Sequence, residues 1–138
     1  MALSEGAVRL KQELMRAVTY QRALEAARLE WEDLLSLEET AEWQPLSDKW
    51  VQEAQAERYA LQKQLAQAQL ENWARIRRVK LTDNRWRILR LRYVQGFTWA
   101  RIVARCGCSK QYILREHNRA LEQIAAGEGA AGSTLAGG

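Results

Sequence analysis

The sequence contains few of the residues that catalytic and metal centres use. It has one His and two Cys in 138 residues, and the Cys residues form a C-G-C motif at Cys106 and Cys108. Together with His117 they are too few for a four-ligand zinc site. The chain also lacks a Ser/His/Asp set, a carboxylate pair in an apolar setting and a phosphate-binding loop. We therefore expect a protein that is not an enzyme and has no metal or cofactor, in which both Cys residues pack as small hydrophobes.

Proline and long apolar runs are also scarce. The single proline is Pro45, and β-branched runs are few, so helix is expected along most of the chain. No run of about 18 uninterrupted apolar residues occurs, which argues against a membrane span. The first residues, MALSEGAVRLKQ, lack the basic and apolar regions of a signal peptide. These absences predict an all-α fold and a cytoplasmic location, with reduced thiols and no membrane contact.

The two signs of charge are unevenly distributed along the chain. Residues 1–74 contain eight Lys or Arg and thirteen Asp or Glu, a net charge of −5. Residues 75–119 contain thirteen Lys or Arg and two acids, Asp83 and Glu116, a net charge of +11. Protein surfaces usually mix both signs, so a segment this basic is suited to neutralising phosphates. The segregation predicts different partners for the two parts of the chain.

Two long helical patterns occupy the acidic part. Over residues 5–39, one set of side chains recurs at alternating spacings of four and three, the pattern of a coiled-coil seam. Its members are Leu10, Leu14, Ala17, Gln21, Leu24, Arg28, Trp31 and Leu35. A second pattern covers 48–80, with one face marked by Ala54, Arg58, Leu61, Leu65, Ala68, Asn72 and Val79. The break at 40–47 contains Pro45, which disfavours helix, and Ser47, which can cap the helix that follows.

Residues 1–80 are therefore predicted to form an antiparallel helical hairpin. Two roles stay open for it at this point. It is either a device for building the core or an arm for dimerisation or partner binding.

Three shorter helices are predicted in the basic part, at 84–95, 99–106 and 110–125. Each follows residues that can cap it, in turn Thr82 or Asp83, Thr98 and Ser109. Gly96 and Gly107 supply the backbone freedom that ends the first two helices. The first helix is apolar nearly all round, so it should lie between neighbouring elements.

The last of the three helices has two distinct faces. Its inward face is expected to carry Ile113, His117, Ala120, Leu121 and Ile124, which gives His117 a structural role. Trp99 is expected in the core, where it anchors the helix at 99–106. Residues 81–126 are thus predicted to form one domain, and the Gly-rich tail at 127–138 is predicted to be disordered.

The helices at 99–106 and 110–125 and the tight turn between them have the layout of a DNA-binding helix-turn-helix. In such a motif the second helix enters the major groove with its first two turns, where side chains meet base edges. Base contacts are expected from Lys110, Gln111, Tyr112 and Arg115. Phosphate contacts are expected from Arg101, Arg105, Ser109 and Arg119. Plain solvent exposure is the alternative for the charged residues, and packing against the neighbouring helix is the alternative for Tyr112.

The last third of the chain resembles region 4 of bacterial sigma factors. The resemblance lies in RILRLRYVQGFTWARIVARCGCSKQYILREHNRALEQI, through its I-L-x-L-R-Y helix, its G-F-T-W-x-x-I-x-x-x-x-G-C-S segment and the R-A-L near its end. It is most similar to small phage- and prophage-encoded proteins that join a helical region to such a module, several of which regulate late transcription. Val103 and Glu116 depart from the pattern, where Ala and an apolar residue are usual. No segment resembles the promoter-melting region, so the chain is not expected to be a complete sigma factor.

Together these features predict a sequence-specific regulator of transcription, of phage or prophage origin, that binds double-stranded DNA. The acidic arm is expected to form a homo-oligomer, with a dimer favoured, or to contact RNA polymerase. Two alternatives remain open. One is a DNA-packaging adaptor of the small terminase type, and the other is a sigma-like module that binds RNA polymerase without DNA.

Overall fold

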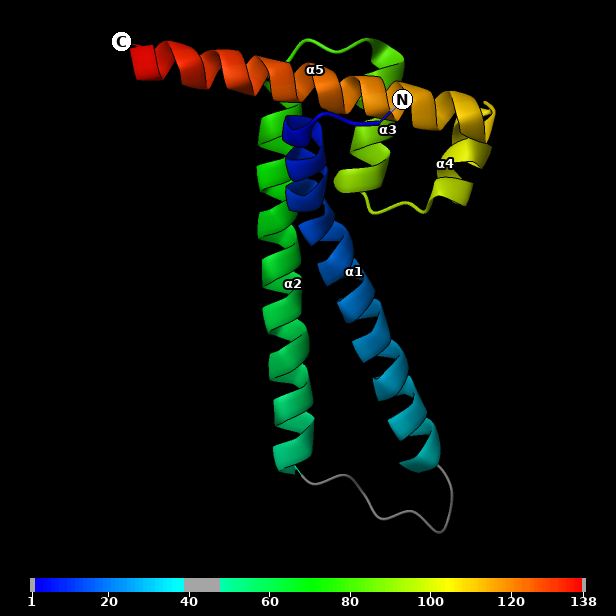
Figure 1. Ribbon diagram of the computed structural model, residues 1–138. Coiled ribbons are helices and arrows are strands. Elements are labelled where there is room, and N and C mark those ends of the chain that lie inside the picture. The colour runs from blue at the N-terminus through cyan, green and yellow to red at the C-terminus, as the bar shows by residue number, and fades with distance from the viewer. Residues whose placement is uncertain (1, 39–47, 138) are drawn as a thin grey trace. The chain divides into compact units, whose positions relative to one another are not determined.

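The computed structural model describes residues 2–38 and 48–137, and within these ranges the chain forms five helices and no strand (Figure 1). The helices are α1 (Glu5–Glu38), α2 (Asp48–Arg77), α3 (Asp83–Tyr93), α4 (Trp99–Cys106) and α5 (Lys110–Gly137). The all-α prediction is confirmed. The predicted break at 40–47, with Pro45 and the Ser47 cap, lies outside the described residues. Among the described helices, none is both long enough and apolar enough to cross a lipid bilayer.

The helices contribute to two compact units, Met1–Val18 with Ala68–Gly138, and Thr19–Gln67. This division differs from the predicted boundary at residue 80. The beginning of α1 and the end of α2 belong with the three C-terminal helices, because Leu14 and Ile76 pack in the same core cluster as Leu121. The seam pattern predicts which side chains are buried, but it does not say which neighbour covers each part of the seam.

Helix α3 lies between two clusters of buried side chains, as its apolar sequence predicts. Leu89 and Tyr93 join a cluster with side chains of α1, α2 and α5. Ile88 and Leu91, on the other side of α3, pack with Ile102 of α4 and Ile113 of α5. Since both faces of α3 are covered, the helix fixes α4 and the start of α5 to the rest of this unit.

Helix α5 is longer than predicted. It continues to Gly137, where the Gly-rich composition predicted a disordered tail from residue 127. The extension begins beside the end of α2, where Arg75 donates to Glu128 at 2.8 Å. Arg75 also pairs with Glu13 of α1. These ion pairs are a tertiary contact that stabilises the first turn of the extension. The composition of residues 127–138 does not predict this contact.

In the second unit the seam of α1 becomes progressively less buried. Leu24 and Trp31 are half-buried, whereas Arg28 and Leu35 are exposed. Arg28 forms ion pairs with two acids of its own helix, Glu25 and Glu32. Large apolar side chains are also exposed in this unit, namely Leu29, Leu35, Trp50 and Tyr59. The Thr19–Gln67 unit therefore presents an acidic surface with interspersed apolar groups.

A buried amide connects three helices of the first unit. The Asn72 side chain of α2 is 5% exposed, and its Nδ2 donates to the backbone oxygens of Leu14 at 3.0 Å and Tyr93 at 2.9 Å. Asn72→Ala is expected to lower the free energy of unfolding by about 1–3 kcal/mol, because the Tyr93 oxygen near the end of α3 loses a buried donor. Urea denaturation followed by circular dichroism measures this change.

Gln64→Ala is the matched control for this prediction, since Gln64 is an exposed amide on the same helix. It should change the free energy of unfolding by less than about 0.5 kcal/mol. Equal stabilities of the Asn72 variant and the unmodified chain would contradict the bridging role.

Candidate nucleic-acid interface

A tight turn between α4 and α5 brings the start of α5 to the surface. Gly107 has φ 65°, a left-handed conformation that favours glycine, and its N–H donates to the backbone oxygen of Val103, in the last turn of α4. The Ser109 hydroxyl accepts from the Tyr112 N–H at 3.1 Å, so Ser109 caps α5 as predicted. Ile113 is 1% exposed and anchors the first turn in the core. The remaining backbone N–H groups at this end can hold a phosphate.

The predicted base-contact residues differ in their surroundings. Lys110, Gln111 and Arg115 are exposed on the first two turns of α5. The Arg115 guanidinium lies 5.5 Å from the centre of the Tyr112 ring. In the part of the chain that the structure describes, neither Lys110 nor Arg115 has a carboxylate within ion-pair distance. Their charges are therefore available to a ligand.

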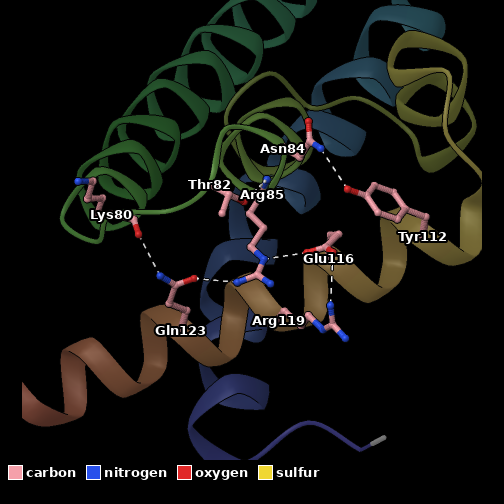
Figure 2. Close-up of polar contacts among 8 residues, drawn as sticks. All are labelled: Lys80, Thr82, Asn84, Arg85, Tyr112, Glu116, Arg119 and Gln123. Carbon is pink, nitrogen blue, oxygen red and sulfur yellow. Dashed lines mark hydrogen bonds and ion pairs between the residues drawn. The ribbon is translucent and has the colours of Figure 1, made fainter.

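Tyr112 lies against α3, which was the alternative to a base contact. Its ring packs on the cluster around Ile102, and its hydroxyl accepts from Asn84 Nδ2 at 3.0 Å (Figure 2). This contact brings the start of α3 beside the start of α5. Arg87, one turn after Asn84, is exposed, and its Nη2 lies 3.5 Å from the backbone oxygen of Arg105.

Asn84 and Arg87 were not predicted as site residues. They precede the helix-turn-helix pattern in the sequence, and only the packing of α3 on the turn places them there. The density of arginines in α3 is a sequence signal that points to Arg87, and no such signal points to Asn84.

The predicted phosphate-contact residues of α4 are exposed. Thr98 caps α4 by accepting from the Arg101 N–H at 3.2 Å, and the buried Ile102 fixes which face turns inward. Arg101 and Arg105 then point away from the core, and the Arg101 guanidinium lies 4.0 Å from the centre of the Phe97 ring. This stacking orients the guanidinium and leaves its charge free to meet an anion.

Arg119 is less available than the sequence predicted, because an acid lies beside it. Glu116 is 9% exposed and accepts from Arg85 Nε at 2.7 Å, while Arg119 Nη1 lies 3.5 Å from its other oxygen. The hydrogen bond from Arg85 lowers the pKa of Glu116, so this carboxylate stays ionised. Figure 2 shows Arg85 reaching from α3 to α5, where it also donates to Gln123. This contact explains the polar residue at position 116.

The inward residues have the structural roles that the sequence predicted. His117 is 1% exposed and lies 2.6 Å from the Tyr93 hydroxyl, and Trp99 contacts its ring edge-on at 4.9 Å. Cys106 and Cys108 are free thiols that pack in the cluster around Ile102. No group of three or more His, Cys, Asp or Glu side chains in the described ranges is arranged to hold a metal ion.

Comparisons with protein-family models, with curated proteins and with solved structures find no match to this chain. The described interface joins the capped start of α5, the exposed bases of α4 and the first turns of α3. It is a positively charged surface, which is suited to a polyanion.

Proposed function

We propose that this chain is a sequence-specific, double-stranded DNA-binding regulator of transcription. In this proposal α4 and α5 act as a helix-turn-helix of the sigma region 4 type, and α5 enters the major groove with its first two turns. The observation that carries the proposal is the capped, exposed start of α5, where Lys110, Gln111 and Arg115 have no carboxylate within ion-pair distance among the residues that the structure describes. Lys and Arg pair with guanine and Gln pairs with adenine, so these side chains are suited to base edges.

Beside the start of α5, Arg101 and Arg105 of α4 and Arg87 of α3 are proposed as phosphate contacts. Phosphate contacts supply most of the affinity and orient the protein, whereas base contacts supply specificity. Arg119 contributes less in this scheme, because Glu116 offsets part of its charge.

The Thr19–Gln67 unit is proposed as the arm that forms a dimer or contacts RNA polymerase. Its net charge is negative, and it exposes Leu29, Trp50 and Tyr59, so it is suited to a protein partner rather than to DNA. A single module of this size buries little surface on DNA, so dimerisation would raise its affinity. The resemblance in the last third of the chain supports a phage or prophage origin.

The test of the proposal is selection from random duplexes at near-physiological salt, with sizing of the bound species. Enrichment of one sequence motif by a monomer or dimer supports regulation. A large closed ring would favour the packaging adaptor. Failure to form any complex with mixed duplexes at low ionic strength would leave the chain as a protein-binding module.

Truncation of the base-contact candidates should weaken binding to the selected duplex. Lys110→Ala and Arg115→Ala are each expected to cost about 1–3 kcal/mol, because each removes a charged donor from the groove face. Fluorescence anisotropy at fixed salt measures the change. Lys63→Ala, an exposed base of the Thr19–Gln67 unit, is the matched control and should leave the affinity unaltered. Unchanged affinity of both test variants would remove these residues from the interface.

A further inference from the structure

A groove of about 910 Å³ runs along one side of α5, separate from its first turn. One edge of the groove is formed by the N-terminal segment, through Ala2 and Leu3. The apolar side chains that line it include Leu3, Leu114 and Ala126, and the cationic ones are Arg85, Arg115 and Arg119. The volume lies within the range of small-molecule sites.

The N-terminal segment is held at the edge of this groove by specific contacts. The Ser4 N–H donates to Glu122 Oε1 at 2.8 Å, which links the segment to α5. The Ser4 hydroxyl accepts from the Ala7 N–H at 3.2 Å, and Leu3 packs against the core cluster. The segment is therefore fixed in place as a wall of the groove.

The charges around the groove favour an anion. Arg85 is engaged by Glu116, and Arg119 is 3.5 Å from the same carboxylate with 56% of its side chain exposed. Within the described residues, Arg115 has no carboxylate within ion-pair distance, although its charge also helps to lower the pKa of Glu116. The one acid that lines the groove, Glu122, already accepts from Ser4. An anion entering here meets three arginines and one acid. The rest of the lining combines apolar side chains, Ala2, Leu3, Leu114 and Ala126, with the neutral polar Asn118 and Gln123.

We propose that this groove binds an amphipathic carboxylate, a medium-length aliphatic chain that ends in one carboxylate. The carboxylate pairs with Arg115 and Arg119, and the chain lies over Leu3, Leu114 and Ala126. A small anion such as inorganic phosphate would leave the apolar part of the groove uncovered, and a neutral chain would leave the guanidinium groups unpaired. The chemistry of the lining therefore selects a ligand with both parts.

A regulatory consequence rests on the proposed function. Because Arg115 belongs both to the groove and to the proposed base-contact face, a bound carboxylate would compete with a duplex. The chain would then release DNA when such a ligand accumulates. Binding of the ligand is testable without DNA, so the two proposals can fail separately.

The probe is decanoate, titrated into the full chain below the concentration at which it forms micelles. Backbone amide shifts in a nuclear magnetic resonance titration should saturate, with the largest changes at Leu3, Leu114 and Ala126. 1-Decanol, which has the same chain without the charge, should bind about tenfold more weakly, and acetate should not bind. Shifts that do not saturate, or that spread over the whole chain, would overturn the site.

Variants test each half of the groove. The double substitution Arg115→Gln with Arg119→Gln should weaken decanoate binding by at least about tenfold, because it removes both charged partners. Ala126→Phe should abolish binding by filling the apolar end, and thermal melting checks that the exposed substitution leaves the fold intact. Arg101→Gln with Arg105→Gln, two exposed bases outside the groove, is the matched control and should bind normally. Equal affinity in the test and control variants would overturn the proposal.

The coupling to DNA has its own readout. Saturating decanoate should weaken duplex binding by about tenfold, and the double variant at 115 and 119 should lose this response. Simultaneous binding of decanoate and duplex without mutual weakening would overturn the coupling and leave the groove as an independent ligand site.

Discussion

Trp99→Ala is expected to lower the free energy of unfolding by about 3 kcal/mol, the largest single effect predicted for this chain. Trp99 packs on the cluster around Ile102, contacts the His117 ring edge-on at 4.9 Å, and lies 4.7 Å from the Arg92 guanidinium. The side chain is half-buried, so the effect falls at the low end of the range for removing a large aromatic. Thermal melting and urea denaturation measure it.

The control for Trp99 is Tyr59→Ala, which truncates an aromatic side chain that is 68% exposed. It should change the free energy of unfolding by less than about 1 kcal/mol. Because α4 has only eight residues, the loss of Trp99 should also impair duplex binding by disordering the support of α5. A Trp99 variant with unaltered melting would show that the indole is not part of the core.

Acidification from pH 7 to pH 5 is expected to destabilise the chain by about 2 kcal/mol through His117. Burial lowers the pKa of His117 to about 4, from an ordinary value of 6.5. A hydrogen bond with Asn118 partly opposes that shift, and the charges of Lys11 and Arg92 add to it. In the unfolded chain His117 takes up a proton near pH 6.5, while the folded chain does not until about pH 4. The free energy of unfolding is therefore unaffected by His117 above about pH 6.5, and it falls as the pH drops from there towards 4.

The hydrogen bonds of His117 explain why the neutral ring is preferred. Nδ1 lies 2.9 Å from Asn118 Oδ1, which can only accept, so Nδ1 carries the proton. Nε2 then accepts from the Tyr93 hydroxyl at 2.6 Å. A second proton on the ring would break that arrangement and place a charge in the core. Burial also raises the pKa of Tyr93, so the hydroxyl stays protonated and remains a donor at neutral pH.

Because the chain has a single His, its resonances report on His117 alone. A pKa near 6.5 in the folded chain would contradict the prediction. His117→Gln, which does not titrate, should retain nearly constant stability between pH 7 and pH 5. The pKa values of Glu116 and Glu128 are lowered from an ordinary value of 4.5, so protonation of these two carboxylates destabilises the folded chain only at more acidic pH.

Much of the local structure follows from short segments of the sequence. The caps at Thr82, Thr98 and Ser109 and the stop at Gly107 lie where side-chain chemistry predicted them. The inward face of α5 is also confirmed, because helical periodicity alone assigns it. These features depend on residues within one or two turns of each other, so the sequence contains all the information needed to predict them.

The site was only partly predictable, because several of its side chains depend on residues that are distant in the sequence. Tyr112 is held by Asn84, and Arg119 lies beside a carboxylate that Arg85 engages, so residues about 30 positions away change what these side chains can do. The division into compact units and the length of α5 likewise differ from what the local sequence predicts. Both depend on α1, α2 and α5 meeting at one core and at the Arg75 bridge.

From its residue order, the chain specifies helices with their caps and inward faces, together with a strongly basic segment beside an acidic one. Periodicity, capping and charge are properties of neighbouring residues, so they can be identified without a fold. The choice of which arginines remain free for a ligand, and the groove beside the N-terminal segment, arise only when distant helices pack. Packing brings side chains that are far apart in sequence within hydrogen-bond distance, and no local pattern encodes those distances.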